Sequence, residues 1–153
     1  MNRREKEGLV RSNRAHAALV YDGADVVGWC QFGSPNELPA RMAVYDRLGV
    51  ASPDWRITCF FADRDRRGEG IARAGLAGAL RIIAAEGGGT VDGYPTVVHG
   101  GRTSNSVLWR GTASMFDDAG FRRLGAVGPA SALMRKTVRR RRARPRAGPN
   151  RAG

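Results

Sequence analysis

The alternation of apolar and polar residues predicts a series of short strands with one long helix among them. Two strand-like segments, Ala17 to Tyr21 and Asp25 to Phe32, are joined by Asp22-Gly23, a dipeptide typical of tight hairpins. Further strands are predicted at Arg56 to Ala62, Thr90 to Tyr94 and Ala132 to Val138. The segment from Ser34 to Pro53 is expected to be an irregular connection, and its residues give no specific chemical code.

The long helix is predicted from Gly70 to Glu86. One stripe of it repeats apolar residues at helical spacing: Ala72, Leu76, Ala79 and Ile83. Arg73 and Arg81 fall on the other side, so one face of the helix should pack on a sheet. Gly87-Gly88-Gly89 should end it.

This helix connects two predicted strands, 56–62 and 90–94, which we expect to be parallel and joined by a right-handed crossover. A second, short helix is predicted from Thr112 to Ala119 and should end at Gly120. The elements therefore indicate one domain of mixed α and β structure.

The charge of the chain is concentrated at its C-terminus. Of the formal net charge of +12, seven units come from arginines after Val138, which leaves +5 for the rest of the 153 residues. The sequence predicts a single domain over residues 1–138 and a disordered arginine-rich tail over 139–153, since the tail has no apolar residue beyond alanine. The tail suggests nucleic-acid binding only weakly, because a basic extension without function explains it equally well.

The remaining composition narrows the class of protein. Cys30 and Cys59 both fall inside predicted strands, which favours buried thiols in a reducing compartment. His16 and His99 are the only histidines and lie far apart, so no metal site is expected. Because nothing resembles a membrane span or an export signal, we expect a cytoplasmic protein without a membrane partner.

The most informative segment follows the strand at 56–62. A charged turn leads into Arg67-Gly68-Glu69-Gly70-Ile71-Ala72, where the long helix opens. Two glycines at this place let the backbone bend close to a ligand, and the free amides of the first helical turn favour a bound phosphate or pyrophosphate. A dinucleotide fingerprint would need a glycine at Arg73, and a Walker-type loop would need a Gly-Lys-Ser/Thr that is absent.

The spacing Arg67-x-x-Gly70-x-Ala72 resembles the acetyl-CoA signature of the GCN5-related N-acetyltransferase (GNAT) superfamily. Gly120-Phe121 is similar to the Gly-Phe pair after the family's second cofactor helix, and the resemblance spans roughly residues 15–138. It implies a mostly antiparallel central sheet with a parallel β-α-β crossover and a splay between the two central strands. It also implies direct transfer of acetyl from acetyl-CoA to an amine of a small molecule or a protein.

The same resemblance implies positions for the cofactor. The pantetheine arm would be held by the main chain of Phe60, Phe61 and Ala62. Amides for the pyrophosphate would come from Gly68, Glu69, Gly70, Ile71 and Ala72. Arg67 would add a charge-assisted contact to phosphate, or would be a solvated loop arginine.

Three residues depart from the family pattern. Arg56 stands where some members carry a glutamate, Phe116 where many carry a proton-donating tyrosine, and Trp109 where an asparagine is common. As replacements we name Asp92 as the base and Tyr94 as a donor or substrate contact, because strand alternation puts both on one face. The alternative is that they are ordinary residues of a turn and a strand end.

Two other functions are left open by the sequence: a non-catalytic acyl-CoA-binding relative, motivated by Arg56 and Phe116, and an RNA- or ribosome-associated protein using the basic tail. Only about fifteen residues precede the first hairpin. The resemblance therefore implies a shortened N-terminal region, a chain that starts late, or a partner chain, such as the second copy of a homodimer, that completes the substrate wall.

Overall fold

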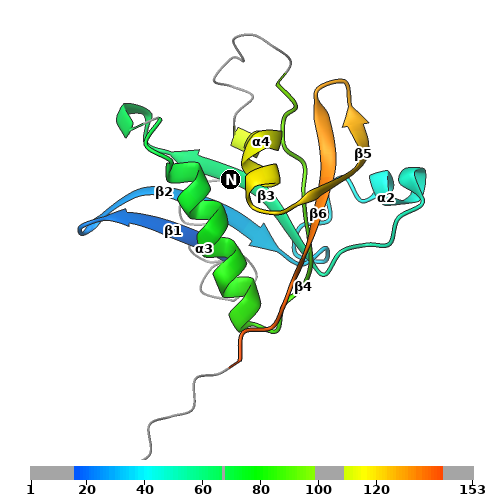
Figure 1. Cartoon of the computed structure of the whole chain (residues 1–153), viewed down its shortest axis with the longest axis horizontal. Helices are drawn as coiled ribbons and strands as arrows, with labels where there is room; N and C mark the ends of the chain where they lie inside the picture. Colours follow the sequence, from blue (N-terminus) through cyan, green and yellow to red (C-terminus); the bar gives the residue numbers. More distant parts are fainter. Residues whose placement is uncertain (1–15, 67, 99–108, 143–153) are drawn as a thin grey trace, which may run out of the picture.

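In the computed structural model, residues 16–66, 68–98 and 109–142 are described. Six strands form one sheet in the order β1-β2-β3-β4-β6-β5 (Figure 1). All neighbours are antiparallel except β3 and β4, which are parallel. The strands are β1 (His16–Asp22), β2 (Asp25–Gly33), β3 (Trp55–Ala62), β4 (Gly89–Gly93), β5 (Arg122–Gly128) and β6 (Ser131–Val138). The predicted mixed, mostly antiparallel sheet is confirmed.

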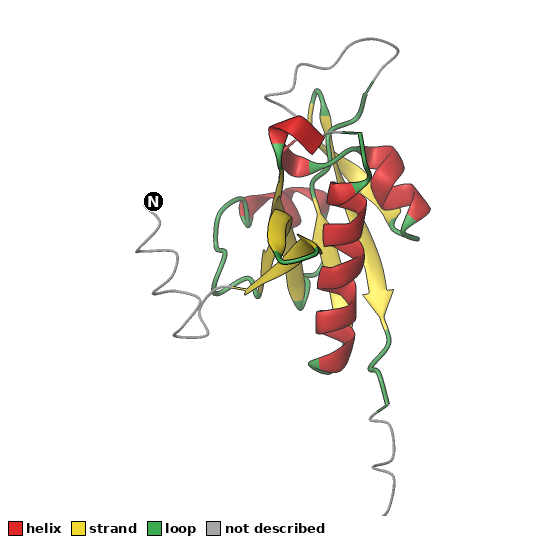
Figure 2. Ribbon diagram, turned by 90° about the vertical axis from the view of Figure 1, so that its left-hand side faces the viewer, coloured by secondary structure: helices red, strands yellow, loops and turns green. Residues whose placement is uncertain are grey.

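The helices differ in length and in the face of the sheet that they cover. The long helix α3 (Ile71–Ala85) stands against the sheet and packs chiefly across β1 and β2 (Figure 2). It connects β3 to β4, as predicted. Two six-residue helices, α2 (Ala43–Leu48) and α4 (Ala113–Asp118), and a short 3-10 helix, η1 (Arg64–Arg66), are the other helical elements in the described ranges.

The core lies in two clusters, one on each face of the sheet. The larger cluster contains the α3 stripe Leu76, Ala79 and Ile83, together with Phe60 and Phe116. The smaller cluster contains Val44 and Tyr45 of α2 with Tyr94 and Leu133. Since Leu133 and its neighbour Met134 belong to different clusters, the alternation of β6 separates the two faces.

The two central strands separate after three residue pairs. Strand β3 pairs with β4 only at Trp55↔Val91, Arg56↔Asp92 and Ile57↔Gly93. The chain after β4 then turns away, and Thr96 bridges to Thr112 and Ser131 instead. The predicted splay is confirmed.

A β-bulge lies at the point where the strands separate. Gln31 of β2 pairs with Cys59 and Phe32 pairs with Ile57, so Thr58 is left unmatched. A bulge bends its strand and increases the local twist, which carries the rest of β3 away from β4.

Two elements were not predicted, and one expectation is corrected. The segment 34–53 is not irregular throughout, because α2 lies within it. Strand β5 was also missed. Both are short segments in which neither helical nor strand periodicity extends far enough to give a signal.

The two cysteines differ in burial, and the start of the C-terminal tail is hydrogen-bonded to α3. Cys30 is buried, and burial raises the pKa of its thiol, whereas Cys59 is half-buried. Residues 139–142 continue from β6, and the Arg141 amide donates to the Ala84 carbonyl (2.8 Å). Since residues 143–153 lie outside the described part, the disordered tail stays a prediction.

Across the described residues, no helix has the length and hydropathy that a membrane span requires. Within those same ranges, no group of three or more His, Cys, Asp or Glu side chains is placed to hold a metal ion.

Candidate functional site

A cavity of about 530 Å³ opens where β3 separates from β4. Its walls are the end of β3, the loop into α3, the first turn of α3 and the segment leading into α4. The lining residues are Phe60, Phe61, Ala62, Arg66, Gly68, Gly70, Ile71, Ala72, Arg73, Trp109, Gly111, Thr112 and Met115. Most residues predicted to hold the cofactor thus surround one cavity.

The edge of β3 that faces the cavity offers main-chain groups. From Gly28↔Ala62 to Gln31↔Cys59 the strand is paired with β2 on one side only, because its pairing with β4 ends at Ile57. Alternate amides and carbonyls of residues 58–62 therefore point into the gap. An extended ligand with amide groups can pair with this edge as an added strand would.

The Phe60 and Phe61 side chains of the same segment pack against other aromatic rings of the protein. The Phe60 ring lies in the core, edge-on to Phe116 with their centroids 6.1 Å apart. The Phe61 ring is 50% exposed and stacks on Trp29. Both aromatic rings fit the expectation that this part of β3 contacts a ligand through its backbone.

The first turn of α3 supplies further donors. Its first helical hydrogen bond runs from the Ala74 amide to the Gly70 carbonyl, so the amides of residues 71–73 have no partner within the helix. Gly70 caps the helix in the left-handed conformation (φ 77°), and no side chain caps it. A Cβ at Gly70 would meet no atom within 4 Å, so glycine is required by backbone conformation, and the space beyond is open.

Two arginines stand at the mouth of the cavity. Arg66 donates to Glu69 (2.8 Å) and to Asp22, and these hydrogen bonds raise the pKa of its guanidinium. Arg73 donates to Asp118 (2.6 Å). These exposed ion pairs are weak individually, so a phosphate could recruit either guanidinium. Arg67 lies outside the described residues, and its predicted contact stays a prediction.

The opposite wall is aromatic and apolar. Trp109 is 44% exposed, and the Arg110 guanidinium lies 4.5 Å from the centre of its ring. Thr112 caps α4 by accepting from the Met115 amide (3.4 Å). Sequence reasoning named Trp109 only as a departure from a pattern, and Met115 not at all.

Phe116 does not line the cavity. It is fully buried, its ring centroid is 4.8 Å from that of Phe121, and its Cε1 would lie 2.2 Å from a Cβ on Gly93. Phe116, which stands where the resemblance implied a proton-donating tyrosine, is therefore part of the core.

The residues named as base and donor, Asp92 and Tyr94, lie on the other face of the sheet. Asp92 is 0% exposed and accepts from Arg135 through both oxygens (Nε 2.7 Å and Nη2 2.8 Å). Tyr94 is 5% exposed, and Arg56 donates to its hydroxyl (Nε to Oη, 3.0 Å). Neither residue lines the cavity, and their catalytic roles stay predictions.

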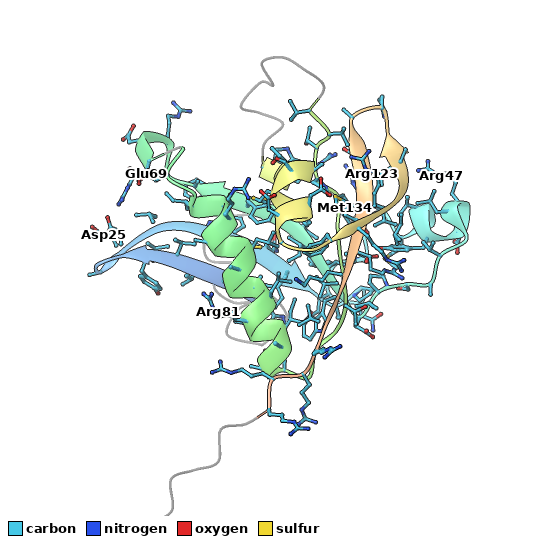
Figure 3. All side chains as sticks on the ribbon, in the orientation of Figure 1. Asp25, Arg47, Glu69, Arg81, Arg123 and Met134 are labelled. Carbon is cyan, nitrogen blue, oxygen red and sulfur yellow. The ribbon has the colours of Figure 1, made fainter. Side chains whose placement is uncertain are left out.

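Tyr45 of α2 joins these two residues and was missed by sequence reasoning. Its hydroxyl donates to Asp92 Oδ2 (2.9 Å) and lies 2.6 Å from the Tyr94 hydroxyl. Burial, the Tyr94 hydroxyl and the Asp92 carboxylate all raise the pKa of Tyr45. In Figure 3, Arg47 of α2 and Glu69 of the loop into α3 are labelled on opposite sides of the molecule.

One more polar group was missed. The Thr58 hydroxyl, at the bulge where the strands separate, is buried and has no hydrogen-bond partner among the described residues.

Comparison with solved structures finds several proteins whose fold is similar over most of this chain. An N-acetyltransferase from Staphylococcus aureus superposes with a TM-score of 0.55 at 17% identity, over 89% of this chain and 74% of that one. A ribosomal-protein-alanine N-acetyltransferase from Brucella melitensis gives 0.53 at 16% identity, over 88% and 75%. A GNAT-family protein from Desulfovibrio desulfuricans gives 0.56 at 16% identity, over 87% and 75%. Neither a family model nor a curated protein sequence matches the chain. At these identities the likeness concerns the fold.

Proposed function

We propose that this chain, which has the fold of the GCN5-related N-acetyltransferases, binds acetyl-CoA and transfers its acetyl group to an amine of a small molecule or a protein in the cytoplasm. One observation carries the proposal: the unpaired edge of β3 and the uncapped N-terminus of α3 border the same cavity. The first suits the amides of a pantetheine arm, and the second suits a diphosphate.

Different groups of the described residues would bind different parts of the cofactor. Main-chain groups of Phe60, Phe61 and Ala62 would pair with the pantetheine, and the amides of residues 68–72 would hold the pyrophosphate. Arg66 and Arg73 would add charge-assisted contacts to phosphate oxygens. Trp109 and Met115 would cover the apolar parts of the arm.

Transfer to an amine requires a neutral nitrogen, a group that takes its proton and a firm alignment of the two reactants. Phe116 has no proton to give to the leaving thiolate. We assign proton handling to Asp92 and Tyr94, the latter being the first residue beyond the last β3–β4 pair.

Calorimetry and thermal unfolding with acetyl-CoA test the binding step. A ligand that binds only the folded chain stabilises it by about 2.7 kcal/mol at a hundred times its Kd. We expect saturable binding and a raised Tm, followed by acetylated products in a mass-spectrometric screen of amines and peptides. The absence of both binding and stabilisation at millimolar acetyl-CoA would contradict the proposal.

A second candidate is a non-catalytic acyl-CoA-binding protein. The observation that favours it is the buried Phe116 together with an Asp92 carboxylate that is already fully paired. The same screen separates the two candidates, because this one predicts tight acetyl-CoA binding without turnover across the whole amine panel.

A further inference from the structure

The buried polar residues opposite α3 form one directed chain of hydrogen bonds. Arg56 Nε donates to the Tyr94 hydroxyl, and the Tyr45 hydroxyl donates to Asp92 Oδ2. Tyr45 has a single hydroxyl proton, and Asp92 accepts it. Across the 2.6 Å between the two hydroxyls, Tyr94 must therefore be the donor.

Both ends of this chain are fixed by arginines. Arg135 donates hydrogen bonds to both oxygens of Asp92 and also to the Ala51 carbonyl (2.6 Å). Arg56 is 1% exposed, donates to the Leu38 carbonyl, and its guanidinium carbon lies 5.1 Å from the centre of the Tyr94 ring. An arginine holds its proton at every physiological pH, so neither Arg56 nor Arg135 can act as the base.

The chain begins where the strands separate. Tyr94 follows Gly93, the last residue of β4 that pairs with β3, and Asp92 lies one residue earlier in that pairing. The Tyr94 oxygen accepts one hydrogen bond from Arg56 and can accept a second. A proton taken up by the Tyr94 oxygen therefore has a defined path of two hydroxyls to a carboxylate.

We propose that Tyr94 and Tyr45 relay the proton of the acceptor amine to Asp92, an inference that rests on the proposed acetyl transfer. As the nitrogen bonds to the acetyl carbon, its N–H bond breaks and the proton passes to the Tyr94 oxygen. The proton of Tyr94 passes to Tyr45, and that of Tyr45 passes to Asp92 Oδ2. The C–S bond breaks with its electron pair on sulfur, and the reverse relay returns one proton, giving an amide and a thiol.

The competing explanation is that the network only holds the segment 34–53 against the sheet, because its arginines bind the Leu38 and Ala51 carbonyls. A holding role predicts equal loss of activity at every pH. A relay predicts a change in pH dependence, since a broken relay obliges the proton to leave to hydroxide or buffer.

The test is the substitution Tyr45→Phe, which removes one hydroxyl and keeps the ring. We expect kcat to fall about 100-fold, as for loss of a general base, with KM for acetyl-CoA unchanged. We expect kcat to become steeply dependent on pH between 7 and 9. Tyr94→Phe should give the same profile, and the double variant should lose no more than either single one, because both interrupt one path.

Tyr21→Phe is the matched control, since Tyr21 is an exposed tyrosine on β1 and should leave both kcat and its pH profile unchanged. If Tyr45→Phe turns over amines with the rate and pH profile of the original protein, the relay is wrong and the proposed function stands. If the original protein binds acetyl-CoA but acetylates no amine, the relay and the transferase assignment both fail, and only the binding site remains.

Discussion

The first and second parts of strand β3 have different surroundings. Arg56 and Ile57 are paired on both sides and lie beside a buried network of charged and phenolic groups. Residues 59–62 are paired only with β2, and Phe60, Phe61 and Ala62 line an open cavity. The difference arises at the Thr58 bulge, which shows how one unmatched residue divides a strand into a closed part and an open part.

The largest effect is expected in the closed part. Asp92→Ala leaves the half-buried Arg135 and the buried Tyr45 hydroxyl without the carboxylate that they bind, and we expect the free energy of unfolding to fall by about 3–5 kcal/mol. The matched control is Asp118→Ala, which breaks the exposed pair with Arg73 and should cost no more than about 1 kcal/mol. Urea unfolding measures both, and equal losses would show that the network contributes no more than a surface ion pair.

In the open part, the expected effect is on binding. Gly70→Ala forces a left-handed backbone on alanine and places a methyl group in the space before α3. We expect acetyl-CoA affinity to fall at least about tenfold, or 1.4 kcal/mol, by calorimetry. Gly23→Ala carries a similar backbone strain (φ 58°) with open space around it, on the β1–β2 hairpin. If both variants lose the same affinity, the loss does not come from the α3 N-terminus.

A smaller loss is expected from the charge at the cavity mouth. Arg73→Gln should weaken acetyl-CoA binding by about threefold to tenfold and should reduce the dependence of affinity on salt. Arg81→Gln removes an exposed arginine from the same helix and is the control (Figure 3). Identical salt dependence in the two variants would remove Arg73 from the phosphate site.

The smallest effect is expected at the C-terminus. Deletion of residues 143–153 keeps Arg141, whose amide bonds to Ala84, and should leave acetyl-CoA affinity within about twofold by calorimetry. The same deletion tests the RNA hypothesis, which requires that RNA affinity and its salt dependence fall. A large loss of acetyl-CoA affinity would mean that the tail contributes to the cofactor site.

The open part could be predicted from the sequence because its signals are local. A strand, a glycine-containing bend and a helix start follow one another within residues 56–72, and the spacing of Gly70 and Ala72 carries the resemblance. The parallel crossover followed from the order strand, helix, strand, and the splay followed from that resemblance.

The closed part could not be predicted in the same way. Tyr45 is 47 residues from Asp92 and sits on a six-residue helix that is too short to give a periodic signal. Alternation along β4 placed Asp92 and Tyr94 on one face, yet nothing local indicates that Arg135 occupies both oxygens of Asp92. Partners brought together only by the tertiary fold leave no mark on either local sequence.

Hydrogen–deuterium exchange with and without acetyl-CoA shows whether the open edge of β3 binds the cofactor. We expect saturating acetyl-CoA to slow exchange at the amides of residues 58–62 that point into the gap and at the amides of residues 68–73, and to leave the already paired residues 55–57 unchanged. Binding seen by calorimetry with no added protection in 58–62 would contradict the assignment of the open edge of β3 as the cofactor site.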